Sequence, residues 1–443
     1  MKPDQIESQS VNSTADSLPD SFDGDSSSSQ TYCPPGGDSL AVAFAIKLFR
    51  ALHEYGTPTY RLEQLMRQVS SRLGLRGEFF SLPTGIFLSF GAPEEQRTAI
   101  VRVEPSSVDL GKLASLQDLT GRIIRGEVTS NEASETVDRI ISAPSGYGSV
   151  LTVLCYGLAS GTGASLFGGG WREVLISTAI GIILGLLASV LGRSEDASRL
   201  FEPAAAILAS SLAIVAARIM QPLSIYIATL AGLIVLFPGL TLTVAIRELA
   251  TRNLVSGTAQ LTSAAVVFLE LAFGVALGSE INRVLPPVHV ARNVVALPMW
   301  TQGVALLIAP LAFAVLLKAR KHDLGWILLA CMGGFAGARF GGLLLGPELG
   351  GFLGALVLGM GGNAYARLLD KTSAILLAPG MLILVPGTVG FSSLSKFLKS
   401  DAVSGVQTAF NMSVIAIALV TGLLVANVLI PQHEAAKRSG KNT

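Results

Sequence analysis

Residues 233–257 read LIVLFPGLTLTVAIRELATRNLVSG, and residues 381–405 read MLILVPGTVGFSSLSKFLKSDAVSG. In each segment an apolar run ends at a Pro-Gly pair, and a Ser-Gly pair begins eighteen residues after the proline. An offset of 148 residues relates the two segments. The same offset pairs other glycines: Gly232 with Gly380, and Gly274 with Gly422. Two dipeptides in register, with matching apolar flanks, indicate an internal duplication.

Ten apolar stretches contain and surround these segments, in two sets of five. Each is close to the ~20 residues that a helix needs to cross a bilayer. We place them near 148–167, 173–192, 203–218, 222–237 and 257–279, and near 296–317, 325–345, 349–366, 373–390 and 406–430. Because five is odd, the second set must start from the opposite side of the membrane. The predicted fold is therefore an inverted repeat of ten transmembrane helices, with a first five-helix repeat over 148–295 and a second over 296–431.

The composition agrees with a membrane protein. The 443 residues have a mean hydropathy of +0.56, and 14% are charged, against about a quarter in globular proteins. A formal net charge of +1 offers no basic surface for nucleic acid. The three cysteines and four histidines are widely scattered, so we expect neither a metal site nor another cofactor.

The chain before the first apolar stretch divides into two parts. Residues 1–39 are rich in Ser and Asp and lack an apolar core, so we expect a disordered tail. Residues 40–147 are predicted to form a small α+β domain, named the head here. Its expected elements are a helix ending before Gly56, a helix from Pro58 to near Gly74, strands over 78–82, 85–90 and 97–103, and helices over 110–124 and 129–142. Thr57 is the expected N-cap of the second helix.

Polar residues of the head could in principle form an enzyme site. His53 and Arg61 flank the helix break at Gly56, where side chains could converge. A solvated helical surface is the simpler explanation, because no nucleophile elbow, phosphate loop or metal-ligand spacing is present. We therefore predict that the protein is not an enzyme. A membrane-tethered hydrolase acting through His53 is the least favoured alternative.

Lysine and arginine in the loops indicate the orientation of the predicted helices. If the head is inside, twelve basic residues lie in inner loops and the tail: Arg193, Arg199, Arg247, Arg252, Lys318, Arg320, Lys321, Arg367, Lys371, Lys437, Arg438 and Lys441. Seven lie outside: Arg172, Arg218, Arg283, Arg292, Arg339, Lys396 and Lys399. The bias favours a cytoplasmic head and a cytoplasmic basic tail over 432–443, with the protein in the cell's inner membrane.

The two Pro-Gly pairs are the predicted substrate site. Proline lacks an N–H donor and glycine frees the backbone, so a helix should break there and leave polar groups that a bound solute can satisfy. An inverted repeat would bring both breaks near one axis. The candidate substrate-binding residues are Pro238, Gly239, Thr241, Thr243, Ser256, Gly257, Pro386, Gly387, Ser404, Gly405 and Asn411. Two ordinary loop turns are the alternative.

Three charged residues are candidates for coupling or gating. Glu270 lies deep in an apolar stretch, where a bare carboxylate is costly, so it is the candidate proton-coupling group. A structural ion pair with an arginine such as Arg339 is the alternative. Arg247 and Glu248 follow the first Pro-Gly pair and form either a gate or a solvated interfacial surface.

Several of these stretches resemble the threonine/serine exporter family. Residues 55–63 (YGTPTYRLE) are similar to its head motif, residues 237–257 to its central signature, and Val385-Pro386-Gly387 to its shorter C-terminal signature. The family usually has Asp where this chain has Glu248. The likeness spans roughly 40–430 and covers both halves, which are separate chains in some relatives.

The resemblance implies proton-driven export of threonine and serine across the lipid bilayer. Other branches of the family are similar in sequence and move small dicarboxylates such as succinate, which is the leading alternative. The expected partners are thus the small-molecule substrate, protons and lipid, with no nucleic acid. The sequence leaves a homo-oligomer open and does not assign a role to the head.

Overall fold

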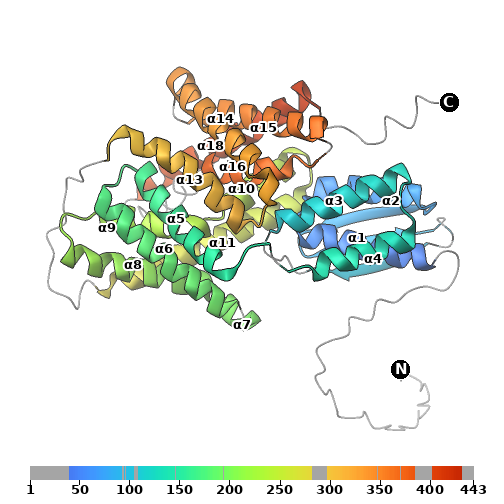
Figure 1. Ribbon diagram of the computed structural model, residues 1–443, viewed down its shortest axis with the longest axis horizontal. Coiled ribbons are helices and arrows are strands. Elements are labelled where there is room, and N and C mark those ends of the chain that lie inside the picture. The colour runs from blue at the N-terminus through green and yellow to red at the C-terminus, as the bar shows by residue number, and fades with distance from the viewer. Residues whose placement is uncertain are drawn as a thin grey trace, which may run out of the picture.

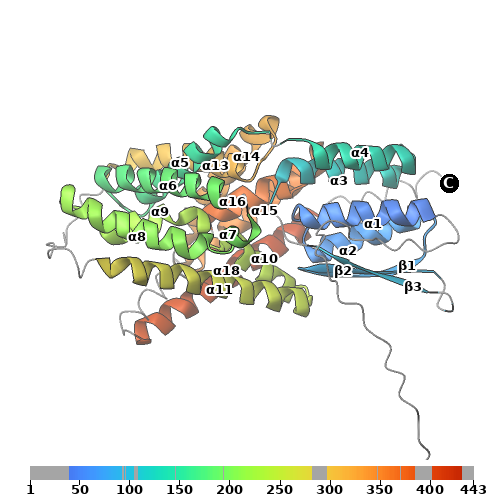
Figure 2. The ribbon, with the colours of Figure 1, turned by 90° about the horizontal axis from the view of Figure 1, so that it is seen from below.

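The computed structural model describes residues 39–431, except 92–93, 95, 104–107, 145, 193, 282–296, 347, 370 and 385–401. The expected N-terminal tail and the basic C-terminal tail lie almost entirely outside the described residues. Figures 1 and 2 show the head at one end of the longest axis of the molecule and a bundle of long helices filling the rest.

The head has four helices on one side of a three-stranded antiparallel sheet (Figure 2). Its elements are α1 (Ser39–Glu54), α2 (Thr59–Arg72), β1 (Gly77–Leu82), β2 (Gly85–Phe90), β3 (Arg97–Arg102), α3 (Leu110–Arg125) and α4 (Ser130–Ser142). Alternation along the strands turns one set of side chains inward, and Phe79, Ile86 and Leu88 are buried against the helices. The strand and helix predictions for the head are confirmed to within about two residues.

The N-cap prediction for α2 is wrong, while that for α4 is right. At α4, Thr129 and Glu132 form the expected capping box. At α2, Pro58 occupies the N-cap position, and no side chain of that position caps the helix. Thr57 is buried, and its hydroxyl has no hydrogen-bond partner among the described residues. The acceptor for the α2 N-terminus comes from another part of the chain, as described below.

The remaining helices form the apolar bundle. They are α5 (Ser149–Leu166), α6 (Trp171–Leu191), α7 (Glu195–Ser198), α8 (Phe201–Ile219), α9 (Ile225–Gly232), η1 (Ile234–Leu236), α10 (Gly239–Ala250), α11 (Leu254–Ser279), α13 (Met299–Leu316), η2 (Lys321–Asp323), α14 (Leu324–Leu345), α15 (Gly350–Leu369), α16 (Ala374–Leu384) and α18 (Ala402–Leu429). Within the described ranges, eight helices are long and apolar enough to cross a membrane. A ninth span results if α9 and α10 count as one bent crossing.

The prediction of ten continuous helices is therefore only partly met. Eight predicted segments correspond to continuous helices. The segment near 222–237 is broken, because α9 ends after eight residues and the chain bends by 48° before α10. The segment near 373–390 contains α16, which has eleven residues and precedes the undescribed range 385–401.

Glycines allow the long helices to pack closely. A Cβ added at Gly274 of α11 would lie 2.6 Å from both Ala206 Cβ and Pro203 O of α8. A Cβ at Gly422 of α18 would lie 2.4 Å from Phe352 O of α15. Small residues at such crossings let backbones approach each other, which drives helix association in lipid.

Candidate functional site

A cavity of about 920 Å³ lies between the head and the helical bundle. The head contributes His53, Glu54, Thr57, Arg61, Gln117, Asp118, Arg122 and Arg125, among others. The bundle contributes residues of α10, α11, α16 and α18 and of the segment before α16, including Leu240, Thr241, Thr243, Arg247, Gln260, Ser263, Lys371, Met381 and Leu423. The wall is thus polar and charged near the head and largely apolar at α16 and α18.

The broken helix brings α10 to this cavity. Pro238 ends the segment that began at α9, and α10 starts at Gly239, whose N–H donates to Phe237 O at 2.7 Å. Thr241 and Arg247 are six residues apart on α10, about 1.7 turns, and both line the cavity. The Thr243 side chain is buried, and its hydroxyl donates to Gly239 O at 3.0 Å. The break predicted at Pro238-Gly239 therefore does give the cavity one of its walls.

Glu248 contacts the head. Its side chain is fully buried, with 0% exposure, and its Oε1 accepts a hydrogen bond of 2.9 Å from the Thr59 N–H at the start of α2. The first N–H groups of a helix lack partners within the helix, and the N-terminus carries a partial positive charge, so a carboxylate is favoured there. Glu248 thus takes the place that Thr57 was expected to fill.

The Ser256-Gly257 pair lies at the same contact. Thr59 Oγ1 and Ser256 Oγ are 2.9 Å apart, and both side chains are buried. A Cβ at Gly257 would lie 2.7 Å from Leu249 Cγ and 2.9 Å from the Leu249 backbone N. Gly257 therefore allows the tight turn between α10 and α11, and neither residue of the pair lines the cavity.

His53 and Arg61 both lie in the cavity wall. Their position on either side of the helix break at Gly56 had suggested that their side chains could converge. The His53 Nε2–H donates to Pro83 O at 3.1 Å, and Nδ1 has no partner among the described residues. In the described part of the chain, no serine or cysteine is hydrogen-bonded to this imidazole. Burial lowers the pKa of His53 below its ordinary value of 6.5, although hydrogen bonds to the Pro83 and Leu82 carbonyls oppose this shift.

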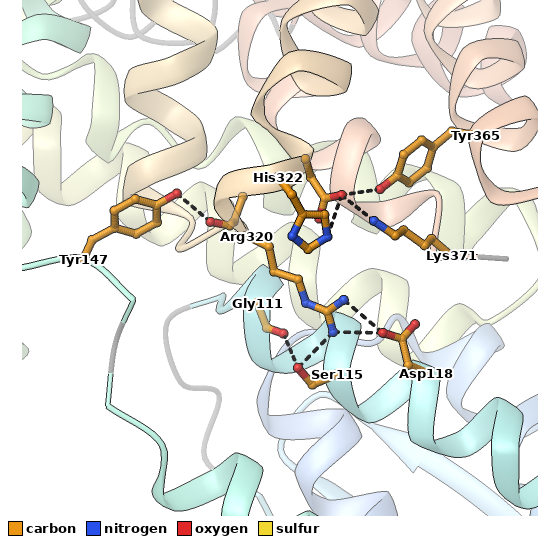
Figure 3. A network of polar contacts seen from close by, with 10 residues as sticks. Gly111, Ser115, Asp118, Tyr147, Arg320, His322, Tyr365 and Lys371 are labelled. Atoms are coloured by element: carbon orange, nitrogen blue, oxygen red, sulfur yellow. Dashed lines mark hydrogen bonds and ion pairs between the residues drawn. The ribbon is translucent and has the colours of Figure 1, made fainter. Parts of the chain in front are cut away.

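A second contact joins the head to the loop between α13 and α14 (Figure 3). Arg320 donates through Nη1 and Nη2 to Asp118 Oδ2, both at 2.9 Å, and through Nη2 to Ser115 Oγ. The backbone N–H groups of Leu110 and Gly111 donate to Leu317 O and Lys318 O. We name this contact the anchor. Side chains of α13, α14, α15 and α16 also belong to the hydrophobic core of the head.

A buried carboxylate connects the anchor to the cavity. Asp323 is 0% exposed, and its Oδ1 accepts from the Tyr365 hydroxyl at 2.6 Å and from Lys371 Nζ at 2.8 Å. His322 Nε2 lies 3.2 Å from the same oxygen. Since Lys371 lines the cavity, Asp323 fixes the position of a cavity cation. Sequence reasoning did not find Asp323, because it lies at the end of a charged loop and not within an apolar stretch.

Several predicted site residues lie outside the cavity. Pro386 and Gly387 are outside the described residues. Ser404, Gly405 and Asn411 are near the start of α18, and Ser404 is about 28 Å along that helix from the cavity residue Leu423. Among the described residues, the first predicted break contributes to the cavity, and the second break lies outside the described residues.

Glu270 also lies outside the cavity lining. It follows the cavity residue Ser263 by seven residues, or about two turns of α11. It is close enough to Glu202 of α8 for their charges to interact. No cluster of metal-ligating side chains occurs among the described residues.

Comparison with known proteins places this arrangement in a family. The family described as "Putative threonine/serine exporter" matches residues 43–282, more than half of the chain. The chain belongs to the threonine/serine exporter family. A second description, "Threonine/Serine exporter, ThrE", matches residues 302–429, so the family occurs here in its two-part form. The protein is thus a membrane protein of an exporter family.

The exporter-family chain is also similar to curated fungal proteins named "Pheromone-regulated membrane protein 10". It is 27% identical to the protein of Pichia sorbitophila over 83% of the chain and 37% of the relative. For Eremothecium gossypii the identity is 28% over 83% and 50%, and for Saccharomyces cerevisiae 27% over 83% and 48%. The chain therefore spans half or less of the length of these relatives. No solved structure matches it.

Proposed function

We propose that the protein is a secondary transporter that exports small hydroxy amino acids, threonine and serine, in exchange for protons. The observation that carries this proposal is the cavity that reaches from the head to the broken helix at Pro238-Gly239, with Thr241 and Arg247 in its wall. Many secondary transporters bind their substrate at polar groups beside a broken helix, and this cavity has polar groups beside the broken helix that ends in α10.

The chemistry of the wall suits an amino acid. The Arg247 guanidinium can bind the substrate carboxylate with two parallel hydrogen bonds. The Thr241 hydroxyl can form a hydrogen bond with the substrate hydroxyl. Leu240 and Met381 supply an apolar floor for the substrate methyl group. The cavity volume of about 920 Å³ leaves room for water around so small a solute.

The inverted repeat remains part of the proposal, and three observations support it. The helices α13, α15, α16 and α18 begin 148 to 150 residues after α5, α8, α9 and α11. The hydroxyl of Tyr147, just before α5, donates a hydrogen bond to the Ala319 carbonyl, just after α13. Ser165 Oγ, near the end of α5, lies 3.5 Å from Thr301 Oγ1, near the start of α13. The two equivalent helices α5 and α13 therefore run in opposite directions.

The domain limits and orientation also belong to the proposal. We assign the head to 40–147 and the repeats to 148–295 and 296–431, in the inner membrane, with the head and the C-terminus in the cytoplasm. In support, the loops that carry Lys318 and Arg320 and the turn that carries Arg252 lie at the head end of the bundle. These loops were assigned to the basic, inner side.

We propose Glu270 as the proton-coupling group. It lies in α11 about two turns beyond Ser263, and a second carboxylate, Glu202, is close to it. A carboxylate within an apolar helix is costly to leave without a partner, which suits a group that binds a proton or a cation. Inward proton movement could then exchange with outward amino acid.

The experiment is efflux from cells that lack their own exporters. Cells are loaded with threonine as a dipeptide, and threonine outside is measured with the wild type, Arg247→Gln and Glu270→Gln. We expect protein-dependent efflux that falls in both variants, with a loss of the response to the pH gradient in Glu270→Gln. Equal efflux with and without the protein, when it is present in the membrane, would contradict the proposal.

A second candidate substrate class is small dicarboxylates. The specific observation in its favour is the pair of cations Arg247 and Lys371 in the cavity wall, because two separated cations suit two carboxylates. Competition between succinate and labelled threonine in vesicles distinguishes the two classes. Succinate should compete strongly only if dicarboxylates are substrates.

A further inference from the structure

We propose that the N-terminus of α2 is a releasable latch on the turn between α10 and α11, and that its release is a step of the transport cycle. The latch consists of Thr59 on the head and Glu248 and Ser256 on the bundle. The inference rests on the proposed function and gives the head a role in it. The head is then a moving part of the transporter.

The first argument is that α2 is capped by a residue far away in the chain. Glu248 follows Thr59 by 189 residues, and its Oε1 satisfies the first N–H of the helix. By contrast, α3 is capped by its own Asp109, which accepts from the Lys112 N–H at 2.9 Å. A helix with its own cap keeps that cap when domains move. A helix capped across an interface loses it when the interface opens, and its N–H groups can then bond to water.

The second argument concerns the size and nature of the contact. Thr59, Glu248 and Ser256 are all buried, so they hold the interface closed through hydrogen bonds in a dry setting. Hydrogen bonds join Thr59 to Glu248 and to Ser256, and no residue of α10 or α11 belongs to the hydrophobic core of the head among the described residues. A contact made by hydrogen bonds can open without unfolding the head, because its groups can bond to water instead.

The third argument is that the latch holds the elements best suited to move. The turn after α10 contains Arg252 in the left-handed region, with a φ of +66°. The α9–α10 pair is bent by 48°, and α10 forms a wall of the cavity. Any rearrangement of α10 that exposes the cavity to the other side must carry Glu248 with it. If the latch holds, the head must move with α10 and leave the anchor. If the latch releases, the head can stay on the anchor while α10 moves.

The test uses a disulfide across the latch. In a full-length variant without the three native cysteines, Thr59→Cys and Ser256→Cys are combined, because their hydroxyl oxygens are 2.9 Å apart. Labelled threonine uptake into proteoliposomes is compared before and after oxidation, and after reduction. Each single-cysteine variant is treated identically, so that effects of the oxidant itself are recognised.

We expect oxidation to lower uptake by the double variant by at least tenfold and reduction to restore it, while the single variants respond to neither treatment. Equal uptake in the oxidised and reduced double variant would overturn the proposal, because the head could then stay latched through the cycle. Absence of uptake in every form, wild type included, would contradict the proposed function, and the next measurement would then decide the latch.

That measurement is amide hydrogen exchange of the unmodified protein, which needs no substrate. The Thr59 N–H should exchange at least several-fold faster than the Lys112 N–H, because the latch opens locally and the cap of α3 does not. Equal and slow exchange at both amides would overturn the proposal. If the protein transports threonine, exchange at Thr59 should rise further during turnover and exchange at Lys112 should not change.

Discussion

The head meets the bundle at two places that differ in their physical nature. The anchor on the α13–α14 loop combines an ion pair, two backbone hydrogen bonds and side chains that belong to the hydrophobic core of the head. The latch on the α10–α11 turn consists of Thr59, Glu248 and Ser256. Both involve buried groups, but among the described residues only the anchor buries apolar side chains continuous with the core of the head.

This difference indicates which contact can open. Opening the anchor would expose apolar surface at a cost of about 25 cal/mol for each Å², together with the hydrogen bonds. Opening the latch exchanges hydrogen bonds within the protein for hydrogen bonds to water. The head is therefore fixed to the second half of the chain and held less firmly by the first half. Three substitution experiments test this contrast.

The largest effect is expected from Asp323→Ala, at the buried carboxylate between the anchor and the cavity. The substitution leaves the Lys371 ammonium and the Tyr365 hydroxyl without their shared acceptor. Removing one partner of a buried pair costs about 3 kcal/mol or more. We expect a clear fall in the midpoint of thermal unfolding in detergent. The control is Asp118→Ala at the exposed edge, where an ion pair is worth about 1 kcal/mol or less. Equal loss in both variants would contradict the role of Asp323 as the buried acceptor that holds Lys371 and Tyr365 beside the anchor.

A smaller and more local effect is expected from alanine at two glycines. At Gly111 a Cβ would lie 2.9 Å from Lys318 O of the anchor, and at Gly257 it would lie 2.7 Å from Leu249 Cγ beside the latch. Each substitution should destabilise the protein by about 1–3 kcal/mol through overpacking. Gly303→Ala is the control, because nothing lies within 4 Å of the added Cβ.

Hydrogen exchange separates the two glycine variants. Gly257→Ala should accelerate exchange at the Thr59 N–H, and Gly111→Ala should accelerate exchange at Leu110 and the residues after it. If Gly257→Ala left Thr59 unchanged, the α10–α11 turn would not control the latch. The measurement thus tells whether the two contacts open independently.

The smallest effect is expected from the pH dependence of His53. Its pKa is lowered in the folded protein, so the unfolded chain binds more protons just below pH 6.5. The free energy of unfolding should therefore be unaffected above that pH and fall as the pH drops from about 6.5 toward the lowered pKa. His53→Gln should reduce this fall. Identical pH profiles of thermal unfolding for the wild type and the variant would show that His53 does not contribute.

Local features of the fold could be predicted from the sequence. The limits of β2 and the capping box at Thr129 follow from residues close together in the chain, and the structure agrees with both. The break predicted at Pro238 is met in part, because α10 begins at Gly239 but the 48° bend lies earlier, between Gly232 and Ile234. Thr57 failed as a cap because the acceptor, Glu248, lies far along the chain, and local patterns contain no information about it. The same reason explains why the shared role of Lys371 and Asp323 was missed.

Of the candidate site, only the part that comes from the first repeat could be predicted from the sequence. Thr241, Thr243 and Arg247 were found because they follow a break visible in the sequence. The head residues of the cavity wall could not be assigned, since a soluble helix surface and a cavity wall have the same polar composition. Ser404 was expected near the first break, but α18 is one continuous helix and keeps it at the far end.

The central claim is that the solute passes through the cavity between the head and α10. The most direct measurement is the protection of a cysteine at Thr241, in a chain without native cysteines, against a water-soluble thiol reagent. Thr258→Cys, exposed on α11 and outside the cavity lining, is the control. We predict that threonine slows modification at position 241 and not at 258, and that modification at 241 stops threonine uptake. Unchanged modification rates with threonine present, together with unimpaired uptake after modification, would contradict the claim.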